Sequence, residues 1–416
     1  MKIETLEKRR TEIYAQMKDE SIAIILSGEP QVRTADQFYD FVVWRNFFYL
    51  TNIDRAKCAF IMIKSETGMR QMLFIDEVTA LEEKWTGVRM KKDEASRRSG
   101  IKESDIYGMP DFEKILGSII TRQDPNVVYF DMERYSYDHP DTHQMIFAKE
   151  FADRYPYITI YNLYPIIAKM RRIKSAEEIE NIKTAIDKTR IGIEAMMKAL
   201  KPGLYEYEIE AYYDFNAKLN GVEEKAFNTI VASGENATVL HYESNDSKMK
   251  KGDLILFDLG CAWHHYAADI SRTFPVDGTF TPRQKEVYQA VLDVEKAVIE
   301  KVKPGASMSE LNELAKDLLT EKCRQLKLAI NNDDDVLNYY YHSIGHGLGL
   351  DTHDVGKYDD TLLAGMVITI EPGLYIAEEA IGVRIEDDIL VTPTGYVNLS
   401  ENIIKEIDEI EAFMNR

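Results

Sequence analysis

Two short motifs occur twice, in the same order, in the second part of the chain. KPGLYEYEIEA (201–211) is matched by KPGASMSELNE (303–313), and each places Glu and then Ile or Leu at the same offset. GDLILFDLG (252–260) is matched by GMVITIEPG (365–373), each with an apolar run between a glycine and a carboxylate. A single match could be a coincidence between common helix stops. Two matches in one order indicate a duplicated unit of helix and hairpin, which restricts this part to a pseudo-symmetric fold.

The first third of the chain has a different pattern. Short apolar runs rich in β-branched and aromatic residues alternate with charged, helix-like segments. Such runs are typical of buried strands with helices packed around them, so we expect a separate α/β domain. The expected strands lie at 21–28, 58–64, 71–76 and 126–131, and the expected helices at 77–98 and 111–122.

The domain boundary is expected near 165–175, where apolar residues begin to recur every three or four positions. Ser175 with Glu178 forms a capping-box pattern at a helix start, and KPG at 201–203 ends the helical region. We expect two helices between these signals. The predicted domains are therefore 1–168, an N-terminal α/β domain, and 169–416, a duplicated catalytic domain of α+β type.

Charge and cysteine content restrict the partners and the compartment. The net charge of −20 argues against nucleic acid or an anionic membrane surface as the main partner. Three cysteines provide no disulfide framework, and the N-terminus lacks the apolar core of a signal peptide. No apolar run approaches the ~20 residues of a membrane span. We expect a cytoplasmic protein.

Two pairs of carboxylates lie on the repeated apolar strands. Asp258 ends one strand and Asp269 begins the next, so a hairpin turn between Trp263 and His264 would place the two aspartates opposite each other. The second copy does the same with Glu371 and Glu386, with a turn near 378–379. Single acidic residues at strand ends are commonly solvated, and Glu378, Glu379, Asp387 and Asp388 are expected to include such cases.

Four carboxylates on apolar strands repel one another unless cations lie between them. Two divalent ions would balance the four charges, and a neutral histidine would complete the ligand set. Oxygen and imidazole ligands without a thiolate favour Mn²⁺, with Co²⁺, Zn²⁺ or Fe²⁺ as alternatives. A pair of such ions can activate water at neutral pH and polarise a carbonyl, which predicts hydrolysis.

Four segments together resemble the metal-binding segments of the M24 metallopeptidases, which comprise methionine aminopeptidase, aminopeptidase P and prolidase and share the duplicated "pita-bread" fold. They are FDLGCAWHHYAADISRTFP, HSIGHGLGLDTHDVG, ITIEPGLYI and GVRIEDDIL. The resemblance runs from about residue 172 to the C-terminus. It implies that Asp269 and Glu386 bridge two metals, that Asp258 chelates one, and that His346 and Glu371 serve the other. It also makes Glu371 the candidate for proton transfer.

Other features resemble the prolyl-specific branch of the family. Arg384 stands two residues before Glu386, and VRTADQFYDFVVWRNFFYLTNI (32–53) is similar to the N-terminal domain of aminopeptidase P. It departs from that pattern at Val42-Val43, where the family has Arg-Gln, and at Asn52, where it has Gly. The resemblance implies an Xaa-Pro aminopeptidase, acting on peptides with proline in the second position, and a homo-oligomer, either dimer or tetramer. The alternatives are an Xaa-Pro dipeptidase (prolidase) and a non-catalytic peptide-binding scaffold.

The histidines divide by position. In HSIGHGLGLDTHD (342–354), only His346 is needed as a metal ligand. By resemblance, His353 contacts the substrate carbonyl, His342 lines the proline pocket, and His241 lies near the scissile group. Arg384 would anchor the substrate or orient these rings; the alternative is a salt bridge to a neighbouring carboxylate. His264 and His265 are expected in an exposed turn.

Overall fold

The computed structural model of this protein describes residues 1–357 and 361–415. The chain divides into two compact units, Met1–Met170 and Arg171–Arg416, close to the boundary expected from the sequence. None of the helices in the described residues is both long and apolar enough to cross a membrane.

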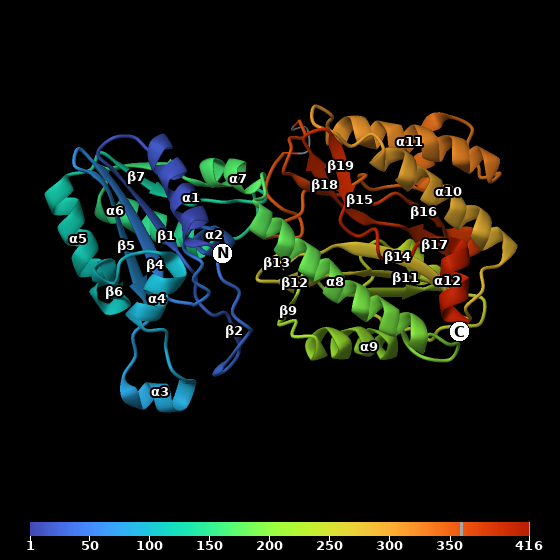
Figure 1. Cartoon of the computed structure of the whole chain (residues 1–416), viewed down its shortest axis with the longest axis horizontal. Helices are drawn as coiled ribbons and strands as arrows, with labels where there is room; N and C mark the ends of the chain where they lie inside the picture. Colours follow the sequence, from blue (N-terminus) through green and yellow to red (C-terminus); the bar gives the residue numbers. More distant parts are fainter. Residues whose placement is uncertain (358–360, 416) are drawn as a thin grey trace. The chain divides into compact units, whose positions relative to one another are not determined.

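The first unit is a six-stranded mixed sheet with helices around it (Figure 1). The strand order is β6-β5-β4-β1-β7-β8, and β1 pairs antiparallel with β4 but parallel with β7. The strands are β1 (Ser21–Leu26), β4 (Ala59–Ser65), β5 (Gly68–Ile75), β6 (Ile106–Gly108), β7 (Val127–Phe130) and β8 (Thr159–Asn162). The helices are α1 (Ile3–Gln16), α2 (Arg45–Thr51), α3 (Ala80–Thr86), α4 (Lys92–Ser99), α5 (Phe112–Gln123), α6 (His143–Arg154) and α7 (Tyr164–Arg171).

The central strand β1 is buried on both faces, which explains why its sequence has no polar alternation. Ile22 and Ile24 pack with α5 and α6 in one core, while Ala23 and Ile25 are buried on the opposite face. The four strands expected from the sequence are confirmed. The segment 77–98 is two helices rather than one, because Gly87 ends α3 with φ of 86°.

The second unit contains the sequence repeat as two similar halves. The first half has α8 (Ala176–Ala199), α9 (Glu206–Leu219), β9 (Glu224–Lys225), β10 (Ile230–Ser233), β11 (Leu254–Leu259), β12 (Cys261–Trp263), β13 (Tyr266–Ala267) and β14 (Ile270–Pro275). The second half has α10 (Pro282–Ile299), α11 (Met308–Gln325), β15 (Val367–Ile370), β16 (Gly373–Ile376), β17 (Ile381–Arg384), β18 (Asp387–Thr392), β19 (Gly395–Asn398) and α12 (Ile407–Met414).

The residues that the two copies of the repeat share are glycines at turns and glutamates at helix starts. The four repeated glycines, Gly203, Gly252, Gly305 and Gly365, all have φ between 86° and 94°, which other residues adopt only with strain. The shared glutamates are the third residues of α9 and α11 and complete their capping boxes, and the apolar residue that follows each is buried. The duplication is therefore confirmed.

One expectation about the helices is wrong. Residues 176–199 form the single helix α8, not two helices, and its start at the Ser175 and Glu178 capping box is as predicted. Gly192 does not interrupt it, because this glycine makes room for Tyr213 of α9: a Cβ there would lie 2.3 Å from the tyrosine ring. Within each half, the first helix packs against strands of the same half: α8 lies against β12 and β13, and α10 lies against β15, β16 and β17 (Figure 1).

Candidate active site

The four predicted carboxylates lie where the strands of the two halves meet. β14 contacts both β17 and β18, and β11 contacts β17. Asp258 is in β11 and Asp269 directly precedes β14, whereas Glu371 follows β15 and Glu386 directly precedes β18. Each half of the repeat therefore contributes one pair of acids to the same region.

The second hairpin has the predicted register. Ile370 pairs with Asp387 and Gly373 pairs with Arg384, so Glu371 and Glu386 lie opposite each other. The turn is at 377–380, as expected from the symmetry of the two glutamates. This prediction is confirmed.

The first hairpin is displaced by two residues from the prediction. Asp258 pairs with Ser271, not with Asp269, and Trp263 pairs with Tyr266. The cause is a two-residue turn at His264-His265, in which both residues have positive φ, 49° and 68°. Asp269 is thus diagonal to Asp258. The turn is centred one residue later than expected, and only His264 is exposed, since the side chain of His265 is 14% exposed and contacts Glu224.

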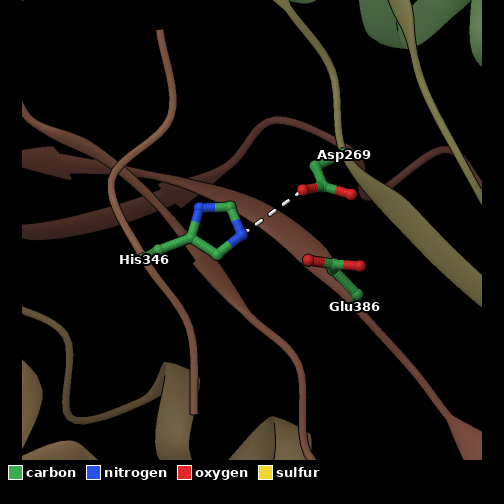
Figure 2. Close-up of side chains that lie close together, drawn as sticks. All are labelled: Asp269, His346 and Glu386. Atoms are coloured by element: carbon green, nitrogen blue, oxygen red, sulfur yellow. Dashed lines mark ion pairs between the residues drawn. The ribbon is translucent and has the colours of Figure 1, made fainter. Parts of the chain in front are cut away.

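The densest part of the site contains Asp269, His346 and Glu386, whose possible ligand atoms all lie within 4.8 Å of one another (Figure 2). The Nε2 atom of His346 is 3.4 Å from Oδ2 of Asp269 and 3.6 Å from Oε1 of Glu371. Figure 2 shows the imidazole directed at the carboxylates of Asp269 and Glu386. One imidazole nitrogen thus faces carboxylates from both halves of the repeat.

Burial makes this concentration of acids unfavourable without a cation. Burial and then repulsion from Glu386 raise the pKa of Asp269 well above its usual range. Burial and then repulsion from Glu371 do the same for the pKa of Glu386. Burial raises the pKa of Glu371 to about 7. The cluster therefore favours a positive charge in its centre.

Asp258 lies beside this cluster and has one free oxygen. Its Oδ2 atom accepts a bond of 2.6 Å from Nη2 of Arg384, so the salt bridge considered for this arginine is present. Its Oδ1 atom is buried and has no hydrogen-bond partner in the described part of the chain. A buried acceptor without a donor is costly, and a cation would satisfy it. The donor set of four carboxylates and one imidazole thus fits divalent metal ions.

The backbone around His346 fixes which ring nitrogen faces the acids. Residues 344–348 run beside β15, with Glu371 N donating to Ile344 O (2.8 Å) and Thr369 N donating to His346 O (2.9 Å). The Nδ1 atom of His346 is 3.0 Å from Gly347 O, so the Nδ1–H donates there and Nε2 is left as the ligand atom. No helix forms in this segment, as its glycines predict.

We expect Gly345→Ala to weaken metal binding. A Cβ at residue 345 would lie 2.0 Å from Thr369 O, so the neighbouring His346 must move away from β15. A displaced ligand typically costs about 10- to 100-fold in metal affinity. Calorimetric titration with Mn²⁺ measures this, and Gly395→Ala, whose added Cβ meets no atom within 4 Å, is the matched control. Equal affinities for both variants would contradict the prediction.

The remaining predicted residues lie around this cluster. Nε2 of His342 is 2.8 Å from the Tyr375 hydroxyl, which also accepts from Nη1 of Arg384 at 3.0 Å. The ring of His353 is 4.3 Å from that of His346, centre to centre. His241 is in an exposed loop. Burial is the largest cause of the lowered pKa of both His342 and His353, and the nearby His241 makes a smaller contribution. All nine predicted residues thus lie in or near one region.

The flanking histidines are neutral. Burial and the charge of Arg384 lower the pKa of His342 to about 3, and burial and the charge of His346 lower the pKa of His353. Neutral rings can accept or donate a hydrogen bond without adding charge beside the cluster. This suits a role toward a polar substrate group rather than toward another carboxylate.

Sequence reasoning missed several buried groups behind the ligands. Tyr375 links Arg384 to His342, and its only sequence signal is its place in the motif EPGLYI. Asp387 and Asp388 are fully buried rather than solvated. Asp387 pairs with Arg272 at 2.6 Å, and Asp388 accepts from Asp269 N at 3.2 Å. Their position directly after Glu386 could have indicated a supporting role.

A second missed feature is a buried ion cluster next to His353. Asp354 accepts from Nη2 of Arg171 at 2.6 Å and from Nζ of Lys174 at 2.8 Å, and both of its oxygens are used. Burial opposes ionisation, but the charges of Lys174 and Arg171 outweigh it and hold the pKa of Asp354 below its usual range. The start of the second unit therefore fixes the loop that carries His353.

We expect Asp354→Asn to destabilise the protein by about 3 kcal/mol or more at pH 7, because it removes the carboxylate that the buried Lys174 contacts and one of the two that Arg171 contacts. The folded-state pKa of Asp354 is depressed. Its contribution is therefore present above the unfolded pKa of about 3.9 and is lost as pH falls through the folded value. Urea unfolding at pH 7 and at pH 3 measures this, and the difference between wild type and variant should shrink at pH 3. The same difference at both pH values would contradict it.

A buried set of carboxylates around one imidazole, built by a duplicated fold and flanked by neutral histidines, defines a metal-dependent hydrolase. The sequence pattern of metallopeptidase family M24 matches residues 180–393, and that of the aminopeptidase P N-terminal domain matches residues 6–129. The chain belongs to metallopeptidase family M24 and to the aminopeptidase P group within it.

Individual relatives agree over the whole chain. The sequence is 34% identical to the Xaa-Pro aminopeptidase of Haemophilus influenzae, over 99% of this chain and 97% of that protein. A solved structure assigned as an aminopeptidase P from Bacillus anthracis has a TM-score of 0.97 and 46% identity, covering 100% of this chain and 99% of the other. The Xaa-Pro dipeptidase of Pyrococcus furiosus is 38% identical, but over only 57% of this chain and 65% of the dipeptidase.

Proposed function

We propose that this protein is an Xaa-Pro aminopeptidase, which removes the N-terminal residue from peptides that have proline in the second position. The observation that carries the proposal is the cluster of Asp269, His346 and Glu386 with Glu371 and Asp258 beside it, next to two neutral histidines. The full-length similarity to Xaa-Pro aminopeptidases supports it, as does the match of the N-terminal domain. The dipeptidase similarity covers only part of the chain, which favours the aminopeptidase.

In this proposal, Asp258, Asp269, His346, Glu371 and Glu386 would together hold two divalent ions. The donor set favours Mn²⁺, with Co²⁺, Zn²⁺ or Fe²⁺ as alternatives. The ions, when bound, would polarise the scissile carbonyl and lower the pKa of water. The neutralised cluster would also remove the repulsion that raises the pKa values of its carboxylates.

The remaining chemistry belongs to side chains of this protein. A peptide bond before proline is a tertiary amide without an N–H, so its nitrogen must receive a proton to leave. Glu371, whose Oε1 atom lies 3.6 Å from Nε2 of His346 at the cluster, accepts a proton from the attacking water and delivers it to the proline nitrogen. His353 and His241 donate to the substrate carbonyl oxygen, where negative charge develops.

Substrate selection falls to the buried chain behind the cluster. His342 borders the proline ring and is held by Tyr375, which is held in turn by Arg384. Arg384 is itself fixed by Asp258. The pocket wall and a metal ligand therefore share one hydrogen-bonded chain, so the position of the proline is coupled to the position of the cluster.

Peptide length distinguishes the two prolyl activities. In the presence of Mn²⁺, we expect the protein to hydrolyse a tripeptide Xaa-Pro-Yaa and to release its first residue. Chromatography of the products measures this. Activity restricted to the Xaa-Pro dipeptide would overturn the aminopeptidase proposal in favour of prolidase. Assembly into a dimer or tetramer and a cytoplasmic location remain predictions; light scattering of the purified protein tests the first.

A further inference from the structure

Glu206, the first residue of α9, is a fully buried carboxylate that the proposed chemistry does not use. Its two oxygens accept five hydrogen bonds. Oε1 accepts from the backbone N and the hydroxyl of Ser233, both at 2.7 Å, and from Nδ2 of Asn236 at 3.0 Å. Oε2 accepts from the hydroxyl of Tyr242 at 2.8 Å and from the backbone N of Ser247 at 2.9 Å.

All five donors belong to one segment, the connection from β10 to β11, and we call residues 233–247 the His241 loop. Ser233 and Ser247 are its two ends, Asn236 lies in its first turn, and Tyr242 is the immediate neighbour of His241. A single side chain therefore fixes the entry, the exit and the middle of the loop. Surface loops with few such ties are mobile, so this degree of buried bonding indicates that the loop's position matters.

The loop is also held from the other side, by strands of the second half of the repeat. Gly382 of β17 lies so close that a Cβ there would be 2.0 Å from Ala237 O. The hydroxyl of Tyr341, the neighbour of His342, donates to Thr238 O at 2.5 Å. The His241 loop is thus fixed between α9 and the elements that carry Arg384 and His342.

The five contacts require a carboxylate. Each partner donates to Glu206, and an ionised carboxylate offers only acceptors. Glutamine has the same shape but would direct an NH₂ group either at Ser247 N or at Ser233 N and Asn236 Nδ2, which cannot accept. Ser233 is buried and Asn236, Tyr242 and Ser247 are half-buried, so unmatched pairs would push the loop away from α9.

We propose that Glu206 is a positioning residue that fixes His241 against the scissile carbonyl. The inference rests on the proposed function, because it requires His241 to contact substrate. His241 has an exposed side chain on a loop, and its own segment provides no rigid element. The five-bonded carboxylate supplies that rigidity, as is needed when a displacement of about 1 Å costs about 100-fold in rate.

A double-mutant cycle tests this role. We would compare wild type, Glu206→Gln, His241→Ala and the double variant as full-length, Mn²⁺-loaded proteins. For each, kcat and KM are measured with Ala-Pro-Ala, and kcat is corrected for the fraction of protein that carries metal. Glu206→Gln is expected to lower kcat/KM by about 10- to 100-fold when His241 is present, but less than about twofold in the His241→Ala background. The same loss factor in both backgrounds would overturn the inference.

Glu178→Gln is the matched control. Glu178 is also a buried carboxylate near a helix start, 2% exposed, and accepts from Ser175 N and the Tyr266 hydroxyl, away from the His241 loop. Any loss in kcat/KM that Glu178→Gln causes should be the same factor in the wild-type and the His241→Ala backgrounds. If Glu206→Gln does not fold, Tyr242→Phe deletes one donor of the five, and its cycle with His241→Ala decides in the same way.

The two proposals fail differently. Wild-type protein that cleaves no Ala-Pro-Ala would overturn the proposed function and this inference with it. If wild type is active and Glu206→Gln lowers kcat/KM by the same factor with and without His241, only the positioning role of Glu206 is overturned. Active wild type with a loss that depends on His241 would support both.

Discussion

Replacing Glu371 by glutamine is expected to lower kcat on Ala-Pro-Ala by about 10²- to 10⁴-fold. The Oε1 atom of Glu371 lies 3.6 Å from Nε2 of His346 at the cluster, where a carboxylate can take a proton from water and return it. The amide of glutamine keeps an oxygen for a metal but cannot carry the proton to the proline nitrogen. The measurement is steady-state kinetics at saturating Mn²⁺, with bound metal determined on the same samples.

The control for Glu371→Gln is His264→Asn. His264 is an exposed turn residue at φ 49°, a conformation that asparagine also tolerates, so activity should stay within about twofold of wild type. Similar losses at both positions would contradict the assignment of roles. A loss at Glu371 that full metal occupancy restores would assign that residue to metal binding alone.

The second prediction has opposite signs for activity and stability. Glu386→Gln should abolish turnover, because it removes a carboxylate placed between the two halves of the repeat. The same change should make the metal-free protein more stable at pH 8. Glu386 is 2% exposed and lies in a cluster of like charges, so one charge fewer reduces the repulsion. Functional sites commonly cost stability in this way.

The pH dependence follows from the raised pKa values. In metal-free protein, a carboxyl whose pKa is raised on folding contributes stability below its unfolded pKa, and this stability is lost as pH rises through the folded value. For Glu371 that interval runs from 4.5 to about 7. Metal-free wild type should therefore lose stability between about pH 5 and pH 8, and the Glu386→Gln variant should lose less.

Thermal unfolding of chelator-treated proteins at pH 5 and pH 8 measures this difference. The expected result is a higher Tm for Glu386→Gln than for wild type at pH 8, and a smaller gap at pH 5. Adding Mn²⁺ should raise the Tm of wild type more than that of the variant. A variant that is less stable than wild type at both pH values would contradict the account of the cluster.

The sequence predicted the two hairpins unequally well, for a local reason. Between Glu371 and Glu386, the turn falls at the midpoint, and the register is as expected. Between Asp258 and Asp269, the turn is formed by His264-His265 at positive φ, without the Asn-Gly or Asp-Gly signal that normally marks such turns. The pairing was therefore misplaced by two residues, although both aspartates still reach the site.

The duplication could be predicted from the sequence because the repeated residues are those that the local backbone conformation requires. Its glycines have positive φ and its glutamates complete helix caps, and both requirements depend only on nearby residues. That α8 is one uninterrupted helix could not be predicted, because the role of Gly192 depends on its contact with Tyr213, a residue of the next helix. Local geometry leaves a sequence signal, whereas packing between elements does not.

The same distinction applies to the site. The cluster around His346 could be predicted because ligand residues recur in recognisable motifs. The bonds behind it join residues more than a hundred positions apart, such as Asp258 with Arg384 and Lys174 with Asp354. Nothing in the sequence pairs these residues. They became visible only when the structure placed buried charges next to one another.

The most direct test of the central claim is a titration of metal-stripped protein with Mn²⁺ while turnover of Ala-Pro-Ala and Ala-Ala-Ala is followed. We expect turnover of Ala-Pro-Ala to rise with metal and to saturate at about two ions per chain, with little or no cleavage of Ala-Ala-Ala. Metal-loaded protein that cleaves neither peptide, or both at equal rates, would contradict the account.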